Sequence, residues 1–326
     1  MLKDCLEVFK KNLDDNGDKY IMDSYIPADG TYIIVEPKND SYEIREVIDM
    51  KLDKRTKEIN QKSNSNFEKI CNYDYNSKLI DMNKPMDGKK VIHSNNYLSF
   101  FIKKESLINE KLTEEIIDTY YAVLSNPSIK YSKSKNATKI YESVEEEFGK
   151  VDVNTLEKIN KWIKEYIFNL NIDVTGKDYL KIFFEYPMED YKREGKRYLI
   201  PNIYNSNDFN ITVKEDIYGV PNDNMGLNAK KPYLENKTRK ITVPYLANNA
   251  DVLLQKKFFD YLMNFAAIGR VNVYIDNVNN KIDAYENGKL PDKNFNGIFI
   301  RVKKGKEVEI HDYDIITGYK PNLRKK

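Results

Sequence analysis

YLKIFFEY, at residues 179–186, is the stretch that decides the fold, because its aromatic and β-branched side chains predict a buried strand. Apolar residues recur at helical spacing in several segments before this stretch and in one segment after it. These patterns predict amphipathic helices at residues 2–14, 113–124, 137–148, 153–170 and 251–267. The predicted strand therefore stands between two groups of helices.

Further β-rich runs lie near both ends of the chain. Tyr20–Ile26 and Thr31–Glu36 flank a Pro-Ala-Asp-Gly turn and predict a hairpin, which Glu43–Met50 extends as a third strand. Four short runs near the C-terminus predict a small antiparallel sheet at residues 271–275, 281–285, 298–302 and 308–311. The fold class is α+β, with mixed helices and small antiparallel sheets around an irregular, loop-rich middle. We expect an N-terminal α+β domain at residues 1–175 and a second α+β region at residues 176–326.

Composition excludes several protein classes. The chain has 326 residues and a formal net charge of +2, so it is long enough for a sizeable core and is not strongly basic as a whole. Cys5 and Cys71 have no partner at metal-binding or redox spacing, so the sequence predicts neither a disulfide framework nor a zinc site. The N-terminus carries acids among its apolar positions, and no apolar run approaches the ~18 residues of a membrane span. We expect a cytoplasmic protein without a membrane partner.

Catalytic motifs are absent from the sequence. It contains no GxxxxGK[ST] phosphate loop, no GxGxxG after a strand, no GxSxG elbow and no HExxH. Only two histidines exist, and the His311-Asp312 pair would need more ligands than His93 alone to form a metal site. The sequence therefore predicts a protein that is not an enzyme and has no cofactor, no metal and no catalytic residue. An unfamiliar metal-dependent nuclease stays open as an alternative.

Two polar segments carry groups suited to nucleic acid. Residues 191–240 hold ten Lys/Arg against six Asp/Glu, interleaved with Asn and Tyr. Basic side chains neutralise phosphates, Asn bonds base edges and Tyr stacks on unpaired bases, so this combination favours nucleic-acid contact. An ordinary Asn/Lys-rich loop is the alternative. Residues 51–66, KLDKRTKEINQKSNSN, predict a mobile loop or a frayed helix that is also suited to touch a phosphate backbone.

Ordered phrases in the chain resemble a known family. They are IPADGTYIIV (26–35), HSNNYLSFFIKKESL (93–107), RYLIPNIYNSNDFN (197–210), GVPNDNMGLNAKKPYLENKTRK (219–240) and VEIHDYDII (308–316). Together they are similar to the large subunit of type I-B CRISPR interference complexes, the Cascade assemblies, and they span most of the chain. Other nucleic-acid-binding or protein-interaction modules remain alternatives.

The resemblance implies a non-catalytic role in antiviral defence. Such a subunit lies beside the subunit that caps the 5′ handle of the CRISPR guide RNA and near the backbone subunits. It helps recognise the motif adjacent to the target (PAM), stabilises opened double-stranded DNA and recruits the helicase-nuclease. Guide pairing reads the sequence, while the protein reads a short duplex motif and holds backbones.

Carried over to this chain, the resemblance implies three groups of contacts. A strand-holding patch comprises Lys192, Arg193, Lys196 and Arg197. A polar surface comprises Asn202, Tyr204, Asn205 and Asn207. A motif-reading loop comprises Asn222, Asn224 and Asn228, with Lys230, Lys231, Lys237, Arg239 and Lys240 on nearby phosphates. Family members are longer and end in a helical bundle, so we expect a truncated chain, a gene fragment or a split subunit that lacks this bundle.

Overall fold

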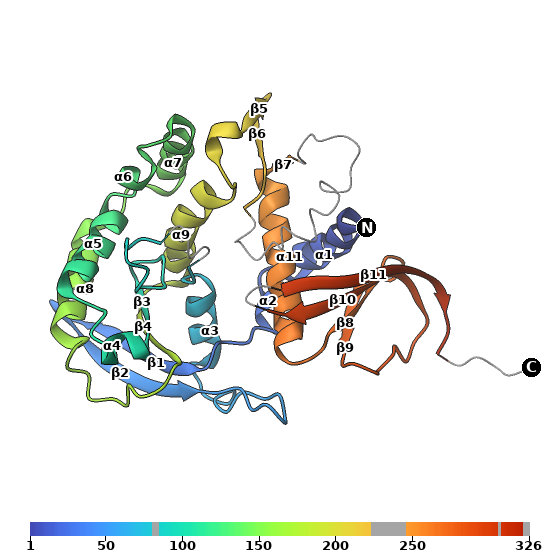
Figure 1. Ribbon diagram of the computed structural model, residues 1–326, viewed down its shortest axis with the longest axis horizontal. Coiled ribbons are helices and arrows are strands. Elements are labelled where there is room, and N and C mark those ends of the chain that lie inside the picture. The colour runs from blue at the N-terminus through green and yellow to red at the C-terminus, as the bar shows by residue number, and fades with distance from the viewer. Residues whose placement is uncertain (80–84, 223–245, 306–307, 322–326) are drawn as a thin grey trace, which may run out of the picture. The chain divides into compact units, whose positions relative to one another are not determined.

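The computed structural model describes residues 1–79, 85–222, 246–305 and 308–321. Its residues divide into two compact units: a central unit, Pro27–Asn202, and a terminal unit formed by Met1–Ile26 with Ile203–Lys326. Figure 1 shows the elements of both. The α+β class is confirmed. The predicted division between residues 175 and 176 falls inside the central unit instead, because the strand at residues 179–184 pairs with strands that precede it by many residues.

The central unit is built on a four-stranded sheet that contains the octapeptide. Its order is β2 (Ser41–Met50), β1 (Gly30–Lys38), β4 (Tyr179–Phe184) and β3 (Ser99–Lys103). Two of its three strand pairs are antiparallel, but β1 and β4 run parallel. A side-chain Cβ at Gly30 would lie 2.4 Å from the carbonyl oxygen of Tyr179, so this pairing requires glycine there. The buried strand predicted from YLKIFFEY is thus an inner strand of a mixed sheet.

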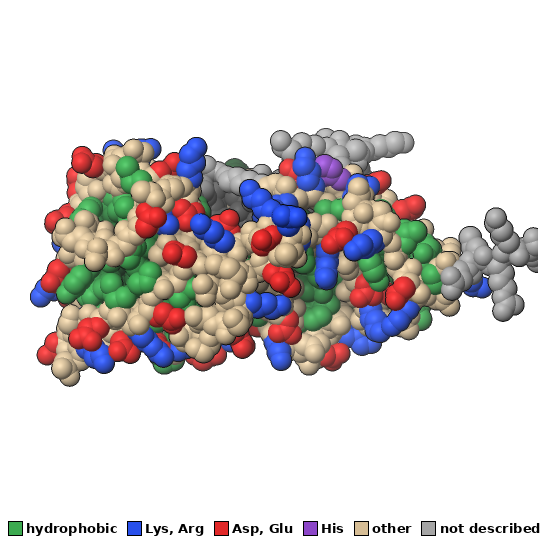
Figure 2. All heavy atoms as spheres, turned by 90° about the horizontal axis from the view of Figure 1, so that it is seen from below, with side chains coloured by type: hydrophobic (Ala, Val, Ile, Leu, Met, Phe, Trp, Pro, Cys, Tyr) green, Lys and Arg blue, Asp and Glu red, His purple; other side chains and the backbone are tan. Residues whose placement is uncertain are grey.

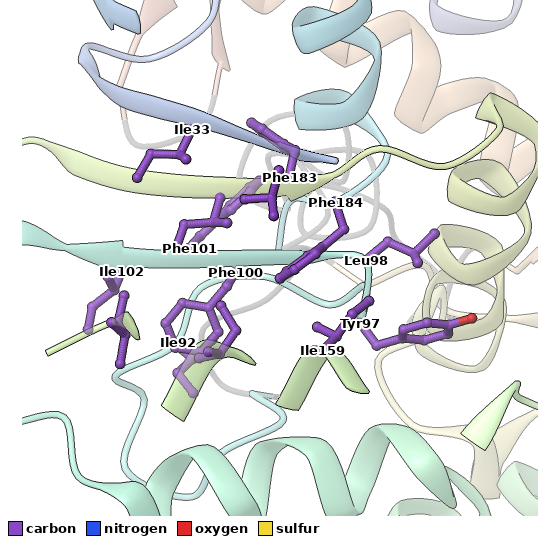
Figure 3. Packing of buried hydrophobic residues seen from close by; sticks show 14 of the residues in the cluster. Ile33, Ile92, Tyr97, Leu98, Phe100, Phe101, Ile102, Ile159, Phe183 and Phe184 are labelled. Atoms are coloured by element: carbon purple, nitrogen blue, oxygen red, sulfur yellow. The ribbon is translucent and has the colours of Figure 1, made fainter. Parts of the chain in front are cut away.

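Helices cover both faces of this sheet, which is why its inner strands are mostly apolar and buried. On one face, Tyr73 of α3 (Phe67–Tyr75) lies 5.9 Å from Phe183, ring centre to ring centre. On the other, Trp162 of α8 (Val153–Tyr166) makes an edge contact with Phe184 at 5.4 Å. Figure 3 shows the phenylalanines of β3 and β4 in this core, with Ile33 of β1 and Ile159 of α8 nearby.

The sequence pattern predicted only two of the remaining helices of the central unit, near residues 113–124 and 137–148, and it did not predict the helix at residues 188–199. The remaining helices are α4 (Lys104–Ile108), α5 (Glu114–Ser125), α6 (Ser128–Tyr131), α7 (Lys135–Phe148), α9 (Met188–Leu199) and the 3₁₀ turn η1 (Ile200–Asn202). Thr113 caps α5 by accepting a hydrogen bond from the amide of Ile116, and Asp152 does the same for α8 through Thr155. The helices predicted around residues 113–124, 137–148 and 153–170 are therefore confirmed, with small shifts at their ends.

The terminal unit joins both ends of the chain. Helices α1 (Leu2–Asn16) and α11 (Asn249–Ala267) pack together through Phe9 and Phe258, whose ring centres are 5.3 Å apart. The predicted hairpin at residues 20–36 is wrong, because Lys19–Met22 forms helix α2. There the ring of Tyr20 stacks on Tyr261 of α11 at 4.8 Å, and this packing overrides the β propensity of the segment.

Two antiparallel sheets complete the terminal unit. The larger has the order β11 (Val308–Tyr319), β10 (Phe295–Lys304), β8 (Asn272–Asp276) and β9 (Lys281–Tyr285), which confirms the predicted C-terminal sheet. The smaller has the order β5 (Ile211–Val213), β6 (Asp216–Gly219) and β7 (Ala247–Asn248), preceded by the 3₁₀ turn η2 (Asn207–Phe209). Along the edge strand β11, the amides of Tyr313 and Ile315 donate to the carboxylates of Asp312 and Asp314 at 2.9 and 2.8 Å.

Within the described parts of the chain, no helix combines the length and the apolar character needed to cross a bilayer.

Candidate nucleic-acid interface

Helix α9 carries the four basic residues of the predicted strand-holding patch. Its sequence suits a helix, since Glu189 and Asp190 lie in the first turn and Lys196 and Arg197 lie in the last. At these positions acidic and basic charges interact favourably with the helix dipole. Gly195 allows close packing, because a Cβ there would lie 2.6 Å from the carbonyl oxygen of Asn76. The helix is therefore fixed tightly in the central unit.

Arg197 is used inside the fold. Its side chain is only 4% exposed, and its Nε and Nη2 donate to the Glu194 carboxylate at 2.9 and 3.2 Å. Its Nη1 donates to the carbonyl oxygen of Gly149 at 2.8 Å. Burial lowers the pKa of a guanidinium, but the bonds and charge of Glu194 outweigh that effect and raise the pKa of Arg197. This corrects the predicted patch, because Arg197 is not presented to a phosphate.

The other three basic side chains of α9 are more accessible, but two of them are paired. Arg193 is 35% exposed, and its Nη2 lies 2.8 Å from Asp190 Oδ1. Lys192 Nζ lies 3.2 Å from Glu189 Oε1. Lys196 is exposed and lies over the ring of Phe148, 5.6 Å from its centre. Spacing of three residues along the helix brings acids and bases together, so α9 presents little uncompensated positive charge.

The predicted polar surface at residues 202–207 is partly buried. Asn202 is 3% exposed and donates to Tyr131 Oη at 2.9 Å and to the Tyr198 carbonyl oxygen at 2.7 Å. Tyr204 is 1% exposed, and its hydroxyl lies 2.7 Å from the Ile217 carbonyl oxygen. Both side chains satisfy buried hydrogen-bonding groups and are not presented to DNA.

Of the rest of that surface, Asn205 is exposed, with its amide bonded to the Val220 carbonyl oxygen at 2.9 Å. Asn207 belongs to η2, and its Oδ1 accepts from Asn210 Nδ2 at 3.1 Å. Asn222 was expected to read the motif, but its side chain is fully buried, so this prediction is also corrected. The remaining predicted contacts of the motif-reading loop lie outside the described residues: Asn224, Asn228, Lys230, Lys231, Lys237, Arg239 and Lys240.

A buried polar cluster connects α9 to the segment HSNNYLSFF. Asn96 Nδ2 donates to the Tyr191 carbonyl oxygen at 3.0 Å, and the hydroxyl of Tyr191 lies 2.7 Å from the carbonyl oxygens of Leu98 and Phe184. Ser94 Oγ lies 2.8 Å from the hydroxyl of Tyr120. Tyr191 is fully buried. These residues hold the α9 segment against β3 and β4. The family-like phrase HSNNYLSFF therefore contains residues that stabilise the fold.

The histidines and cysteines form no reactive group in this structure. His93 Nε2 donates to the Lys90 carbonyl oxygen at 3.3 Å and its Nδ1 accepts from the Tyr179 hydroxyl at 3.0 Å, while burial lowers its pKa. His311 lies 3.2 Å from Glu309 on exposed β11. Burial raises the pKa of Cys5 and Cys71 to about 12. Among the described residues, no group of three or more His, Cys, Asp or Glu side chains is arranged to hold a metal.

A recess beside Arg197 was not foreseen from the sequence. Its lining includes Met86, Asn95, Tyr97 and Leu124, and its cavity volume is about 10 Å³. That is far below the ~300 to 1,000 Å³ of typical ligand pockets. The recess therefore has the size of a packing irregularity under α9.

Sequence reasoning also missed a basic segment at the start of α7. Lys133, Lys135 and Lys139 are exposed, and the sequence has no acid between Asp118 and Glu142. This gap in acidic residues was the available signal. Figure 2 shows acidic and basic side chains interspersed over the face it displays, so basic surfaces on this protein must be sought locally.

Comparisons of the chain with protein families, with curated proteins and with solved structures find no significant match.

Proposed function

We propose that this chain is a non-catalytic, nucleic-acid-binding large subunit of a type I-B CRISPR surveillance complex. In that role it helps recognise the target-adjacent motif, stabilises opened target DNA and recruits the helicase-nuclease. The observation that carries the proposal is the order of the family-like phrases, which run from Ile26 to Ile316 and fall in both compact units.

The physical roles of these phrases support the proposal at the level of the fold. IPADGTYIIV supplies Gly30 and the buried part of β1, and HSNNYLSFF supplies the polar cluster around Asn96. RYLIPNIYN supplies Arg197 and Asn202, which bond inside the central unit. Residues that combine several buried hydrogen bonds tolerate few substitutions, so a shared pattern of this kind favours a shared architecture.

The contacts proposed for nucleic acid are fewer than the sequence suggested. Lys196 and Asn205 are exposed, and Arg193 and Lys192 would have to exchange their carboxylate partners for phosphates. The asparagines and basic residues from 224 to 240 stay proposed contacts of the motif-reading loop. A protein that holds backbones while a guide RNA reads sequence needs few base contacts of its own.

Co-purification tests this proposal. The chain is co-expressed with a CRISPR guide RNA, the handle-capping subunit and the backbone subunits from its own source, with an affinity tag on a backbone subunit. We expect the chain and the guide RNA to elute together at a fixed ratio. Assembly of the other subunits with guide RNA but without this chain would overturn the proposal.

The variant Asn96→Ala tests whether the α9 segment takes part in assembly. It removes an amide that bonds the Tyr191 carbonyl oxygen, so it loosens the α9 segment without touching an exposed side chain. We expect this variant to be recovered in the complex at a lower ratio than the unaltered chain. Equal recovery would mean that the α9 segment is not needed for assembly and would restrict the interface to other regions.

A further inference from the structure

Between β2 and α3, the chain forms a narrow hairpin. Figure 1 shows this hairpin as an extension of the central unit. Leu52 and Ile59 pair as an antiparallel bridge. The amide of Asp53 donates to the Glu58 carbonyl oxygen at 2.8 Å, and the amide of Asn60 donates to the Lys51 carbonyl oxygen at 3.1 Å. Residues 51–60 are therefore a built hairpin, which corrects the mobile loop or frayed helix expected there.

The tip of the 51–60 hairpin is organised by Asp53. Its Oδ1 accepts from the amides of Arg55 and Thr56 at 2.6 and 2.8 Å, and the amide of Lys57 donates to the Asp53 carbonyl oxygen at 2.9 Å. Lys57 closes the turn in the left-handed region, at φ 62°. An aspartate that accepts from the following amides is a common way to fix a turn.

The base of the hairpin is anchored to the sheet. Asp29 Oδ1 accepts from the amide of Leu52 at 2.9 Å. Asn60 bridges two partners, since its Oδ1 accepts from the amide of Lys51 and its Nδ2 donates to the Asp49 carbonyl oxygen, both at 2.9 Å. A site supported by such bonds is better pre-organised than one on an unsupported loop.

The hairpin presents cations without carboxylate partners. Lys51, Lys54, Arg55 and Lys57 are exposed, and none of them forms an ion pair with another described residue. The two acids of the hairpin offset only part of this charge, because four basic residues face two acidic ones. Asp53 accepts from backbone amides and lies near Lys57, and Glu58 is exposed and forms no ion pair with a described residue.

We infer that the 51–60 hairpin is a contact for the sugar–phosphate backbone of a nucleic acid, with Lys54, Arg55 and Lys57 as the phosphate ligands. The inference rests on the proposed function for the class of partner and adds a site on the central unit, far in sequence from residues 191–240. Arg55 brings a planar guanidinium that suits phosphate, and the two lysines bring point charges.

A membrane surface fits this hairpin less well. Peripheral membrane binding combines basic residues with apolar side chains that enter the bilayer. Between Asp53 and Glu58 the hairpin has only polar and charged residues, and Ile59 is buried. The hairpin therefore offers charge without an apolar anchor.

The test is a salt titration of binding by the full chain. Affinities for a labelled 20-base-pair DNA duplex and for a single-stranded RNA of equal length are measured by fluorescence anisotropy at several salt concentrations. The variant Lys54→Gln/Arg55→Gln/Lys57→Gln is compared with the unaltered chain. We expect at least a tenfold loss of affinity at low salt and a salt slope lower by roughly two to three, about one for each phosphate contact.

The matched control removes three charges from scattered positions of the same unit. It is Lys150→Gln/Lys161→Gln/Lys177→Gln, whose three lysines are all exposed. We expect a change in affinity of less than about threefold, because net charge alone acts weakly at these distances. The single variant Glu58→Gln provides a test of opposite sign, since removal of an acid from the hairpin should tighten binding about twofold to threefold. Circular dichroism and the denaturation midpoint establish that each variant is folded.

Each outcome is decisive. The inference is overturned if the hairpin variant and the control lose affinity equally, or if neither loses affinity. It is also overturned if the unaltered chain binds neither oligonucleotide. Binding to vesicles with 30% phosphatidylserine that exceeds binding to both oligonucleotides overturns it in favour of a membrane contact. The relative losses on duplex and RNA identify the strand type. Failure of the hairpin variant to differ, in a chain that still co-purifies with guide RNA, would reject the hairpin alone and leave the proposed function standing.

Discussion

Helix α9 and the 51–60 hairpin have nearly the same charge in the sequence but opposite uses of it in the structure. α9 carries four basic and three acidic residues, and the hairpin carries four basic and two acidic residues. Helical spacing of three residues brings the acids of α9 onto its bases, while the hairpin turns its acids toward backbone amides or solvent. A count of cations along a sequence therefore does not locate a binding surface, because what matters is which cations already have partners.

Loss of the Glu194 carboxylate gives the largest expected effect. Glu194→Ala leaves the buried guanidinium of Arg197 without its anion, and breaking a buried pair in this way typically costs about 3 to 5 kcal/mol. Glu58→Ala in the hairpin should change the free energy of unfolding by less than about 0.5 kcal/mol, because Glu58 is exposed and forms no ion pair within the described part of the chain. Urea denaturation followed by circular dichroism measures both.

The double variant Glu194→Leu/Arg197→Met sharpens this result. Replacing both charges with apolar side chains leaves no unpaired buried ion at this position, so we expect the double variant to be clearly more stable than Glu194→Ala. If Glu194→Ala were no more harmful than Glu58→Ala, Arg197 would be accessible in solution. The cations of α9 and of the hairpin would then no longer differ in whether they are available to bind.

Next in size is the anchor that holds α9 in place. Tyr191→Phe removes a fully buried hydroxyl that lies 2.7 Å from two carbonyl oxygens. The Leu98 carbonyl oxygen still accepts from the amide of Phe184, so the loss of one buried hydrogen bond should reduce the free energy of unfolding by about 0.5 to 1.5 kcal/mol. Tyr313→Phe on exposed β11 is the matched control and should have no measurable effect. Equal denaturation midpoints for the two variants would contradict the buried position of α9.

Arg193→Ala should have a smaller effect on stability. Arg193 is partly exposed, and ion pairs of this kind contribute about 0.2 to 1 kcal/mol. Because Asp190 and Glu194 already neutralise it, we also expect Arg193→Ala to leave the salt slope of nucleic-acid binding nearly unchanged, in contrast to Arg55→Ala. A drop of about one in that slope for Arg193→Ala would show that Arg193 contacts a phosphate despite its carboxylate partners.

The smallest effect is a titration at the hairpin tip. The amides of Thr56 and Arg55 hold the pKa of the Asp53 carboxyl below its usual value. Because the folded pKa is the lower one, the stability that this carboxylate gives the turn is present above the ordinary value of about 3.9 and is lost as the pH falls toward the folded value. An NMR titration of Asp53, with the amide signals of Arg55 and Thr56, measures it. An ordinary pKa would indicate that the tip is frayed.

The sequence predicted local elements better than long-range pairings. YLKIFFEY predicted a buried strand, because a strand with apolar side chains on both faces is stable only when both faces are covered. The apolar periodicity of residues 153–170 predicted α8. The parallel pairing of β1 with β4 joins residues far apart in the chain, so no local pattern specifies it. The same holds for α2, which is a helix because Tyr20 meets Tyr261.

The candidate site was predicted less well for a related reason. In the sequence, nothing distinguishes Arg197 from other basic residues, because its partner, the carbonyl oxygen of Gly149, lies in a distant segment. Asn202 and Tyr204 are buried by partners that are likewise distant in sequence. The 51–60 hairpin was noticed as polar, but its order depends on Asp29 and on the bridge formed by Asn60, which composition does not reveal.

The edge of β11 has a consequence for how copies of this protein behave at high concentration. An exposed edge strand is a template on which another strand can polymerise, which is a route to aggregation. Along β11 the carboxylates of Asp312 and Asp314 occupy the amides of Tyr313 and Ile315. An incoming strand would have to displace both carboxylates and lie beside two negative charges. The two aspartates therefore act as gatekeepers that oppose edge-to-edge association despite the exposed side chains of Tyr313 and Ile315.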